Sequence, residues 1–101
     1  MMDNGIEERY MGELKQILSS IPEIEEAVLY GSRARGDYHR ISDIDLSLKG
    51  EKLTSRELNL LRDKLYLSRI PYFFDTNIFS QLKNNTFIQN ILRDGKVIYR
   101  R

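Results

Sequence analysis

Two aspartates separated by one residue, Asp43 and Asp45, are the side chains of this sequence with the clearest chemical potential. They begin the segment 43–48, where polar and apolar residues alternate strictly, as in a half-buried β-strand. Residues two apart on a strand point to the same face, so the two carboxylates repel each other when ionised. A divalent cation relieves that repulsion, and oxygen ligands without His or Cys favour Mg²⁺ or Mn²⁺. The alternative is a pair of aspartates that simply face water at a strand edge.

A Gly-Ser pair twelve residues upstream of the carboxylates offers a place for a phosphate. Gly31 and Ser32 follow a buried strand predicted over 24–30, and Ser32 is expected to cap a short helix. Glycine lets the backbone approach a phosphate closely, and a helix N-terminus presents free N–H groups to an anion. Arg33 and Arg35 lie in that first turn, where they oppose the helix dipole unless an anion is nearby. With the carboxylate pair, this layout predicts a metal-dependent phosphoryl-transfer site.

A third carboxylate is expected, because a two-metal site usually needs one more ligand. The segment 72–79 is rich in aromatic and β-branched residues and predicts a strand whose single acid is Asp75. An acid inside an apolar strand is costly without a partner, so we predict that Asp75 lies beside Asp43 and Asp45. An edge-strand aspartate facing solvent is the alternative. Ser42 is predicted either to orient the carboxylates within a nucleotide site or to close a turn.

The elements that must position these residues alternate along the chain. Thr54 and Glu57 fit a capping box, and Thr86 is expected to begin the last helix. Helices are predicted over 6–19, 33–35, 54–68 and 86–94, and strands over 24–30, 43–48, 72–79 and 97–99. This order predicts an α/β (α+β) fold, a mixed four-stranded sheet flanked by helices, in one domain spanning 1–101.

Composition excludes several classes of site. The absence of Cys rules out thiolate ligands, a Cys nucleophile and disulfides, and the single His39 argues against a His-rich metal site. No apolar run could span a membrane and the first residues do not read as a signal peptide, so we expect a cytoplasmic protein. Residues 1–50 carry a net charge of −4 and residues 51–101 one of +5. Without an overall basic patch, no stable binding to nucleic acid is expected.

The segments Gly31–Gly36 and Ser42–Leu46 together resemble the signature of the polymerase-beta-like nucleotidyltransferase superfamily. The whole stretch 28–48 is most similar to the minimal nucleotidyltransferases, the MNT proteins. These commonly act as the antitoxin of a toxin–antitoxin module whose toxin is a HEPN-domain ribonuclease. The element order and Asp75 extend the resemblance over nearly the full chain, whereas residues 80–101 carry no motif that can be compared.

The resemblance implies a mechanism. Asp43 and Asp45 would hold two Mg²⁺ ions, Asp75 would complete the site of the catalytic ion, and Gly31 and Ser32 would bind the β- and γ-phosphates of ATP. Nucleotide contacts would extend to Arg33, Arg35 and Ser42. The group transferred would be AMP, and the acceptor would be a tyrosine of a HEPN toxin in a type VII-like module.

Two other functions stay open from the sequence. The domain could neutralise a toxin by binding alone, with vestigial carboxylates. It could also modify a small molecule such as an aminoglycoside, although relatives of that kind carry a further domain for the acceptor. We expect that 101 residues are too few to hold an acceptor as well as a triphosphate, so that the acceptor surface comes from another protein.

Overall fold

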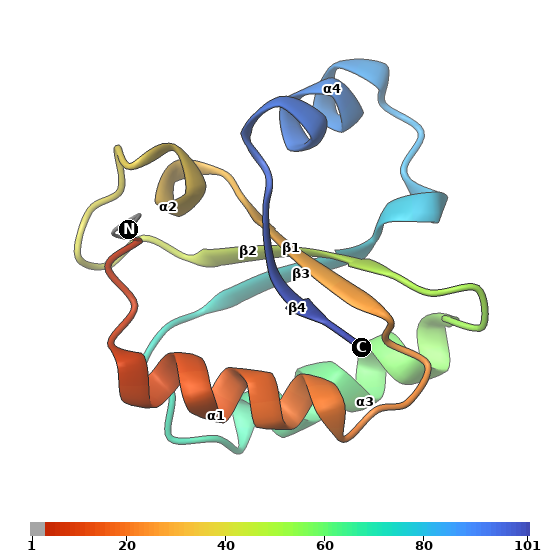
Figure 1. The fold of residues 1–101 in the computed structure, drawn as a ribbon, viewed down its shortest axis with the longest axis horizontal. Helices are drawn as coiled ribbons and strands as arrows, with labels where there is room; N and C mark the ends of the chain where they lie inside the picture. The colour runs from red at the N-terminus through yellow and green to blue at the C-terminus, as the bar shows by residue number, and fades with distance from the viewer. Residues whose placement is uncertain (1–3) are drawn as a thin grey trace.

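The four strands form one mixed sheet in the order β3-β2-β1-β4 (Figure 1). The computed structural model describes residues 4–101. Strand β1 pairs antiparallel with both β2 and β4, whereas β2 and β3 run parallel. The strands are β1 (Glu26–Tyr30), β2 (Ile44–Lys49), β3 (Phe74–Ile78) and β4 (Lys96–Arg100). The predicted mixed four-stranded sheet is confirmed, and β2 and β3 carry the predicted aspartates at neighbouring positions.

Helices cover the sheet on both sides. Figure 1 shows α1 (Glu8–Ser19) and α3 (Ser55–Tyr66) together on one side and α4 (Asn85–Asp94) on the other. The short α2 (Ser32–Arg35) follows the end of β1, and its Ala34 packs into the cluster on the α1 and α3 side. A short 3₁₀ turn, η1 (Phe79–Gln81), follows β3. Within residues 4–101 no helix combines the length and the apolarity that crossing a membrane requires. The order of elements along residues 4–101 confirms the predicted alternation of helices and strands, to which η1 is added.

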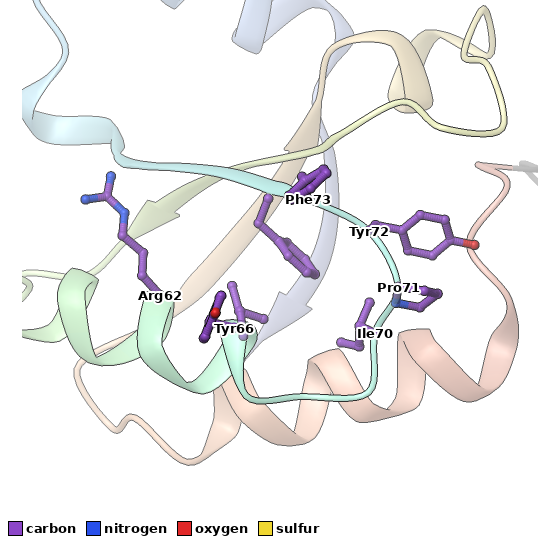
Figure 2. A pocket seen from close by; sticks show the side chains of 8 residues that line it. Arg62, Tyr66, Ile70, Pro71, Tyr72 and Phe73 are labelled. Carbon is purple, nitrogen blue, oxygen red and sulfur yellow. The ribbon is translucent and has the colours of Figure 1, made fainter.

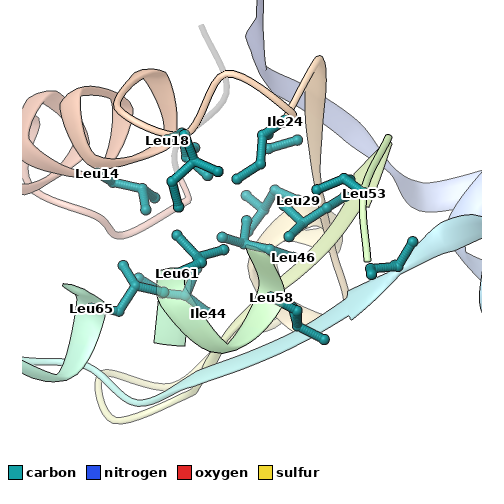
Figure 3. Close-up of a cluster of buried hydrophobic side chains, with 14 of the residues drawn as sticks. Leu14, Leu18, Ile24, Leu29, Ile44, Leu46, Leu53, Leu58, Leu61 and Leu65 are labelled. Carbon is teal, nitrogen blue, oxygen red and sulfur yellow. The ribbon is translucent and has the colours of Figure 1, made fainter. Parts of the chain in front are cut away.

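The main core lies between the sheet and the pair α1 and α3 (Figure 3). Ile44, Leu46 and Leu48 of β2 are all fully buried there, because alternate residues of a strand share a face. The opposite face has a smaller apolar cluster, in which Val28 and Tyr30 of β1 pack against Ile91 of α4. The alternation that buries the leucines of β2 therefore directs its polar residues to the α4 side of the sheet.

Of the four predicted helix starts, that of α3 is confirmed and the other three differ, with α1 beginning at Glu8 instead of residue 6. The capping box of α3 is present, since Thr54 accepts from the Arg56 N–H while the Glu57 side chain accepts from the Thr54 N–H. Helix α4 starts earlier than predicted, because the side chain of Asn84 caps it by accepting from the Phe87 N–H. Helix α2 is capped by Gly31 instead of Ser32, and no side chain bonds to its first turn.

Candidate active site

The three predicted carboxylates lie on the face of the sheet opposite the main core. Asp45 of β2 is in register with Tyr30 of β1 on one side and with Asp75 of β3 on the other. Asp43 precedes β2 and is exposed, and Ile44 between the two aspartates is fully buried in the main core. The strand alternation thus places Asp43 and Asp45 on one face, and the parallel pairing of β2 with β3 brings Asp75 alongside.

Negative charge accumulates at Asp45. Partial burial raises its pKa to about 6, and the neighbouring carboxylates Asp75 and Asp43 add to this rise. The cations of Arg35 and Arg33 act in the opposite direction. Burial, followed by the charges of Asp75 and Asp45, likewise raises the pKa of Tyr30 to about 12. The site is therefore a place where positive charge would be strongly stabilised.

Gly31 brings the backbone of the β1–α2 turn into contact with Asp45. Its φ of 76° and ψ of −156° lie in a region that is essentially open only to glycine. A Cβ atom at this position would overlap Asp45 Oδ2. Gly31 therefore joins the end of β1 closely to Asp45 in the carboxylate row, the set of Asp43, Asp45 and Asp75. Its predicted approach to a phosphate stays a prediction.

Helix α2 begins at this turn. Its first backbone hydrogen bonds run from the Ala34 and Arg35 N–H groups to the Gly31 carbonyl oxygen, at 3.1 Å each. In a helix of this geometry the N–H groups before these two, those of Ser32 and Arg33, have no partner within the helix. Ser32 itself is half-buried beside Gly31. The turn thus presents backbone N–H groups next to the carboxylates.

The expectation that Arg33 meets the nucleotide conflicts with its position. Its side chain is 1% exposed, and its Nε and Nη2 donate to the Ser42 carbonyl oxygen at 3.1 and 2.8 Å. Its Nη1 donates to the Asn4 carbonyl oxygen at 3.0 Å, and its guanidinium carbon lies 4.7 Å from the centroid of the Tyr72 ring. Arg33 therefore ties the N-terminal segment and the loop before β2 to α2, and its donors are not available to a phosphate.

We predict that Arg33→Met lowers stability without changing nucleotide affinity. The substitution leaves the carbonyl oxygens of the half-buried Asn4 and Ser42 without these donors and should lower the free energy of unfolding by about 2–4 kcal/mol. Urea unfolding measures the loss, and calorimetric titration with ATP under conditions where the variant is folded measures affinity. An Arg33→Met protein of normal stability but weakened ATP binding would return Arg33 to the nucleotide site.

Arg35 and Ser42 are the other residues predicted to contact the nucleotide, and they have different surroundings. Arg35 is exposed, forms ion pairs with Asp37 at 3.3 Å and Asp94 at 3.9 Å, and acts on the charge of Asp45. It therefore stands at the rim of the site between α2 and α4. The hydroxyl oxygen of Ser42 accepts from the His39 N–H at 2.7 Å and closes a turn. Of the two roles considered for the Ser42 side chain, closing a turn is the one seen in the structure.

A chain of hydrogen-bonded polar side chains beside the carboxylates, Ser47, Asn77 and Tyr30, was not predicted from the sequence. Ser47 Oγ donates to Asn77 Oδ1 at 2.7 Å, and Asn77 Nδ2 donates to the Tyr30 hydroxyl oxygen at 2.9 Å. Ser47 and Asn77 follow Asp45 and Asp75 by two residues on their strands, so they share the same face. That spacing was the available signal, because the polar positions of β2 continue from Asp45 to Ser47.

The donor set at the sheet face suits a hard divalent cation. Carboxylate oxygens without His or Cys are the ligands of Mg²⁺ and Mn²⁺, and the raised pKa of Asp45 shows that its charge lacks full compensation. Within residues 4–101 no three acidic or histidine side chains are already grouped closely enough to hold a metal ion. Side-chain rotation of the exposed aspartates Asp43 and Asp75 would be needed to complete such a group.

An apolar pocket of about 420 Å³ opens elsewhere, between the end of α3 and the start of β3 (Figure 2). Tyr66, Ile70, Pro71 and Phe73 are among its lining residues. Arg62 of α3 also lines it and donates to the hydroxyl and the carbonyl oxygen of Thr76. The pocket borders the main-core side of the sheet and contains none of the three aspartates, so it is no part of the carboxylate site.

Sequence comparison identifies relatives that match most of the chain. The family model described as "Polymerase beta, Nucleotidyltransferase" matches residues 12–101. A protein of Methanocaldococcus jannaschii named "Putative protein adenylyltransferase" is 30% identical over 99 residues, which cover 95% of this chain and 89% of that protein. The range matched by the family model contains the Gly31–Ser32 turn and all three aspartates of this chain.

Solved structures share the fold. A toxin–antitoxin crystal structure with AMP-PNP aligns with a TM-score of 0.73 at 22% identity, covering 90% of this chain and 73% of that one. A tri-AMPylated HEPN toxin of Shewanella oneidensis in complex with an MNT antitoxin aligns with a TM-score of 0.66 at 19% identity, covering 90% and 70%. The predicted nucleotidyltransferase fold is thereby confirmed. Because the family model spans residues 12–101, nearly the whole chain, this chain belongs to the polymerase beta nucleotidyltransferase family.

Proposed function

We propose that this chain is a metal-dependent protein adenylyltransferase that moves AMP from ATP to a tyrosine of a HEPN-domain toxin. It would thereby act as the antitoxin of a type VII-like module. The observation that carries the proposal is the contact of Gly31 with Asp45, which places a backbone turn suited to phosphate beside three carboxylates on one sheet face. The names of the M. jannaschii relative and of the toxin–antitoxin structures support the choice of a protein acceptor.

Each residue of the site has a role in this proposal. Asp43 and Asp45 would hold two Mg²⁺ ions, and Asp75 would complete the site of the catalytic one. Bound there, the cations would neutralise charge on the attacking and leaving oxygens. The N–H groups of the Gly31–Ser32 turn would receive the β- and γ-phosphates of ATP, and Arg35 could reach a phosphate from the rim.

The reaction is an in-line displacement at the α-phosphate. The tyrosine hydroxyl oxygen forms a bond to the α-phosphorus while the bond from that phosphorus to the bridging oxygen of the β-phosphate breaks, and pyrophosphate leaves. Asp75 lies on the edge strand β3 and is exposed, so an acceptor can approach it from outside the sheet. In this proposal its carboxylate would accept the hydroxyl proton, whereas the triphosphate would be held at the Gly31 end of the row.

Transfer of label tests the proposal directly. The full chain is incubated with its HEPN partner, Mg²⁺ and ATP labelled at the α-phosphate, and the partner is expected to acquire label on tyrosine. No label should appear with γ-labelled ATP or in the presence of EDTA. Label that persists when both Asp43 and Asp45 are replaced by Asn would refute the assignment.

The same variants separate catalysis from neutralisation by binding. If the chain acts by transfer, the double Asp→Asn variant should bind the toxin but leave its ribonuclease activity intact. A toxin fully silenced by that variant would favour a binding antitoxin. Products formed with small hydroxyl compounds in the absence of any partner would instead point to a small-molecule transferase.

A further inference from the structure

Tyr30 reaches across the sheet to the strand that carries Asp75. It stands on β1, whereas its hydroxyl accepts from Asn77 on β3, and β2 lies between these two strands. Tyr30 is paired with Asp45 of β2, whereas Asn77 is paired with Ser47 of β2. The ring of Tyr30 therefore passes over β2 between Asp45 and Ser47. The hydroxyl thus lies beside Asn77, which follows Asp75 by two residues on β3 and shares its face of the sheet.

The hydrogen bonds behind Tyr30 fix the direction in which its hydroxyl can donate. Ser47 donates to the amide oxygen of Asn77, so the amide nitrogen of Asn77 faces Tyr30 and donates to it. A tyrosine hydroxyl that accepts one hydrogen bond still has its own proton to give. The nearby groups that act on Tyr30 through their charge are the carboxylates of Asp75 and Asp45, both of which are acceptors.

The ring and the hydroxyl of Tyr30 serve different contacts. The ring packs edge-on against Phe87 of α4, with centroids 5.5 Å apart and planes at 87°, and belongs to the smaller apolar cluster. A phenylalanine would make that contact equally well. The hydroxyl, with the fully buried Ser47 behind its partner Asn77, is a polar addition that packing does not require.

We propose that Tyr30 is a positioning residue of the transfer site. Once the exposed side chain of Asp75 turns toward Asp45 to hold a cation, the Tyr30 hydroxyl would donate to one of its carboxylate oxygens and leave the other for the cation. Ser47 and Asn77 fix the direction of that donation. The inference rests on the proposed function, since it assigns Asp75 to a metal ion. Hydrogen bonds from residues that do not touch the metal hold the metal-binding side chains in orientation. Their loss typically costs about 10- to 100-fold in metal affinity.

Binding of Mn²⁺ to the full chain, measured by isothermal titration with the metal alone, tests this role without relying on activity. Tyr30→Phe should weaken Mn²⁺ binding by about 10-fold. Asn77→Ala should also weaken it, but should have no further effect when Tyr30 is already Phe, because Asn77 acts through the hydroxyl. Tyr99→Phe, which removes a hydroxyl from the other edge strand, is the matched control and should bind Mn²⁺ like the parent.

The outcomes separate this inference from the proposed function. Mn²⁺ binding that is lost in Asp45→Asn but unchanged in both Tyr30→Phe and Asn77→Ala would overturn the role of Tyr30 and leave the metal site standing. A parent chain that binds no Mn²⁺ would overturn both. Circular dichroism checks that each variant is folded, and if Tyr30→Phe does not fold, unchanged binding in Asn77→Ala overturns the inference by itself.

Discussion

Replacing Asp45 by Asn is expected to abolish AMP transfer while it makes the metal-free chain more stable at neutral pH. Asp45 occupies the centre of the carboxylate row, between Tyr30 and Asp75, and in our proposal it binds both cations. Loss of such a ligand removes several kcal/mol of transition-state stabilisation, which corresponds to a rate about 10³-fold lower or more. The amide has nearly the same shape as the carboxylate, so it should fit beside Gly31 without its charge.

The gain in stability follows from the raised pKa of Asp45. A carboxyl group with a pKa of about 6 in the folded chain and an ordinary value near 3.8 in the unfolded chain takes up a proton on folding between these values. The folded state binds more protons there, so the free energy of unfolding falls as the pH rises through that interval. With allowance for screening by solvent, the deficit above pH 6 is on the order of 1–2 kcal/mol.

Urea unfolding in EDTA at pH 4 and pH 7 measures this effect. The advantage of Asp45→Asn over the parent should be small at pH 4 and fully developed at pH 7. Asp63→Asn, at an exposed position of α3 on the other side of the sheet, is the matched control and should show no such difference. Equal stability of parent and variant at both pH values would mean that Asp45 bears no uncompensated charge, and the electrostatic case for a cation would fail.

The positions of Asp45 and Asp75 could be predicted because strand alternation acts locally. The pattern 43–48 settles which side chains of β2 leave the core, whatever the strand order, and an acid inside the apolar run 72–79 marks the next strand. What alternation leaves open is which strands are neighbours. The parallel pairing of β2 with β3, and with it the row Tyr30–Asp45–Asp75, is a property of the assembled sheet.

Arg33 and Tyr30 show why the rest of the site could not be predicted. Two arginines two residues apart look alike in the sequence, yet Arg33 is buried by carbonyl groups of the N-terminal segment and of the loop before β2, while Arg35 stays exposed. From the sequence, Tyr30 is typical of a core residue, and only the folded structure brings its hydroxyl to Asn77 of β3. Both assignments depend on partners far along the chain, which local periodicity does not encode.

The Gly31→Ala substitution is expected to have the largest effect on folding and to impair transfer as well. The backbone of Gly31 adopts a conformation that costs other residues about 1–3 kcal/mol, and the added methyl group would overlap Asp45 Oδ2. Displacing a packed neighbour costs a further 1–3 kcal/mol or so, for a total of about 2–6 kcal/mol. Because Asp45 must move, transfer should fall by about 100-fold or more even where the variant is folded.

Gly36→Ala is the matched control, because Gly36 also has a positive φ, of 92°, but a Cβ there would meet nothing within 4 Å. Its loss of stability should stay at about 1–2 kcal/mol, and transfer by the folded variant should be normal. A double-mutant cycle then isolates the contact with Asp45. Once Asp45 is Ala, only its Cβ remains, 3.5 Å from the added methyl group, so Gly31→Ala should cost less than in the parent. Additive effects would show that backbone strain alone requires glycine at this position, and that the turn and the carboxylate row are not coupled.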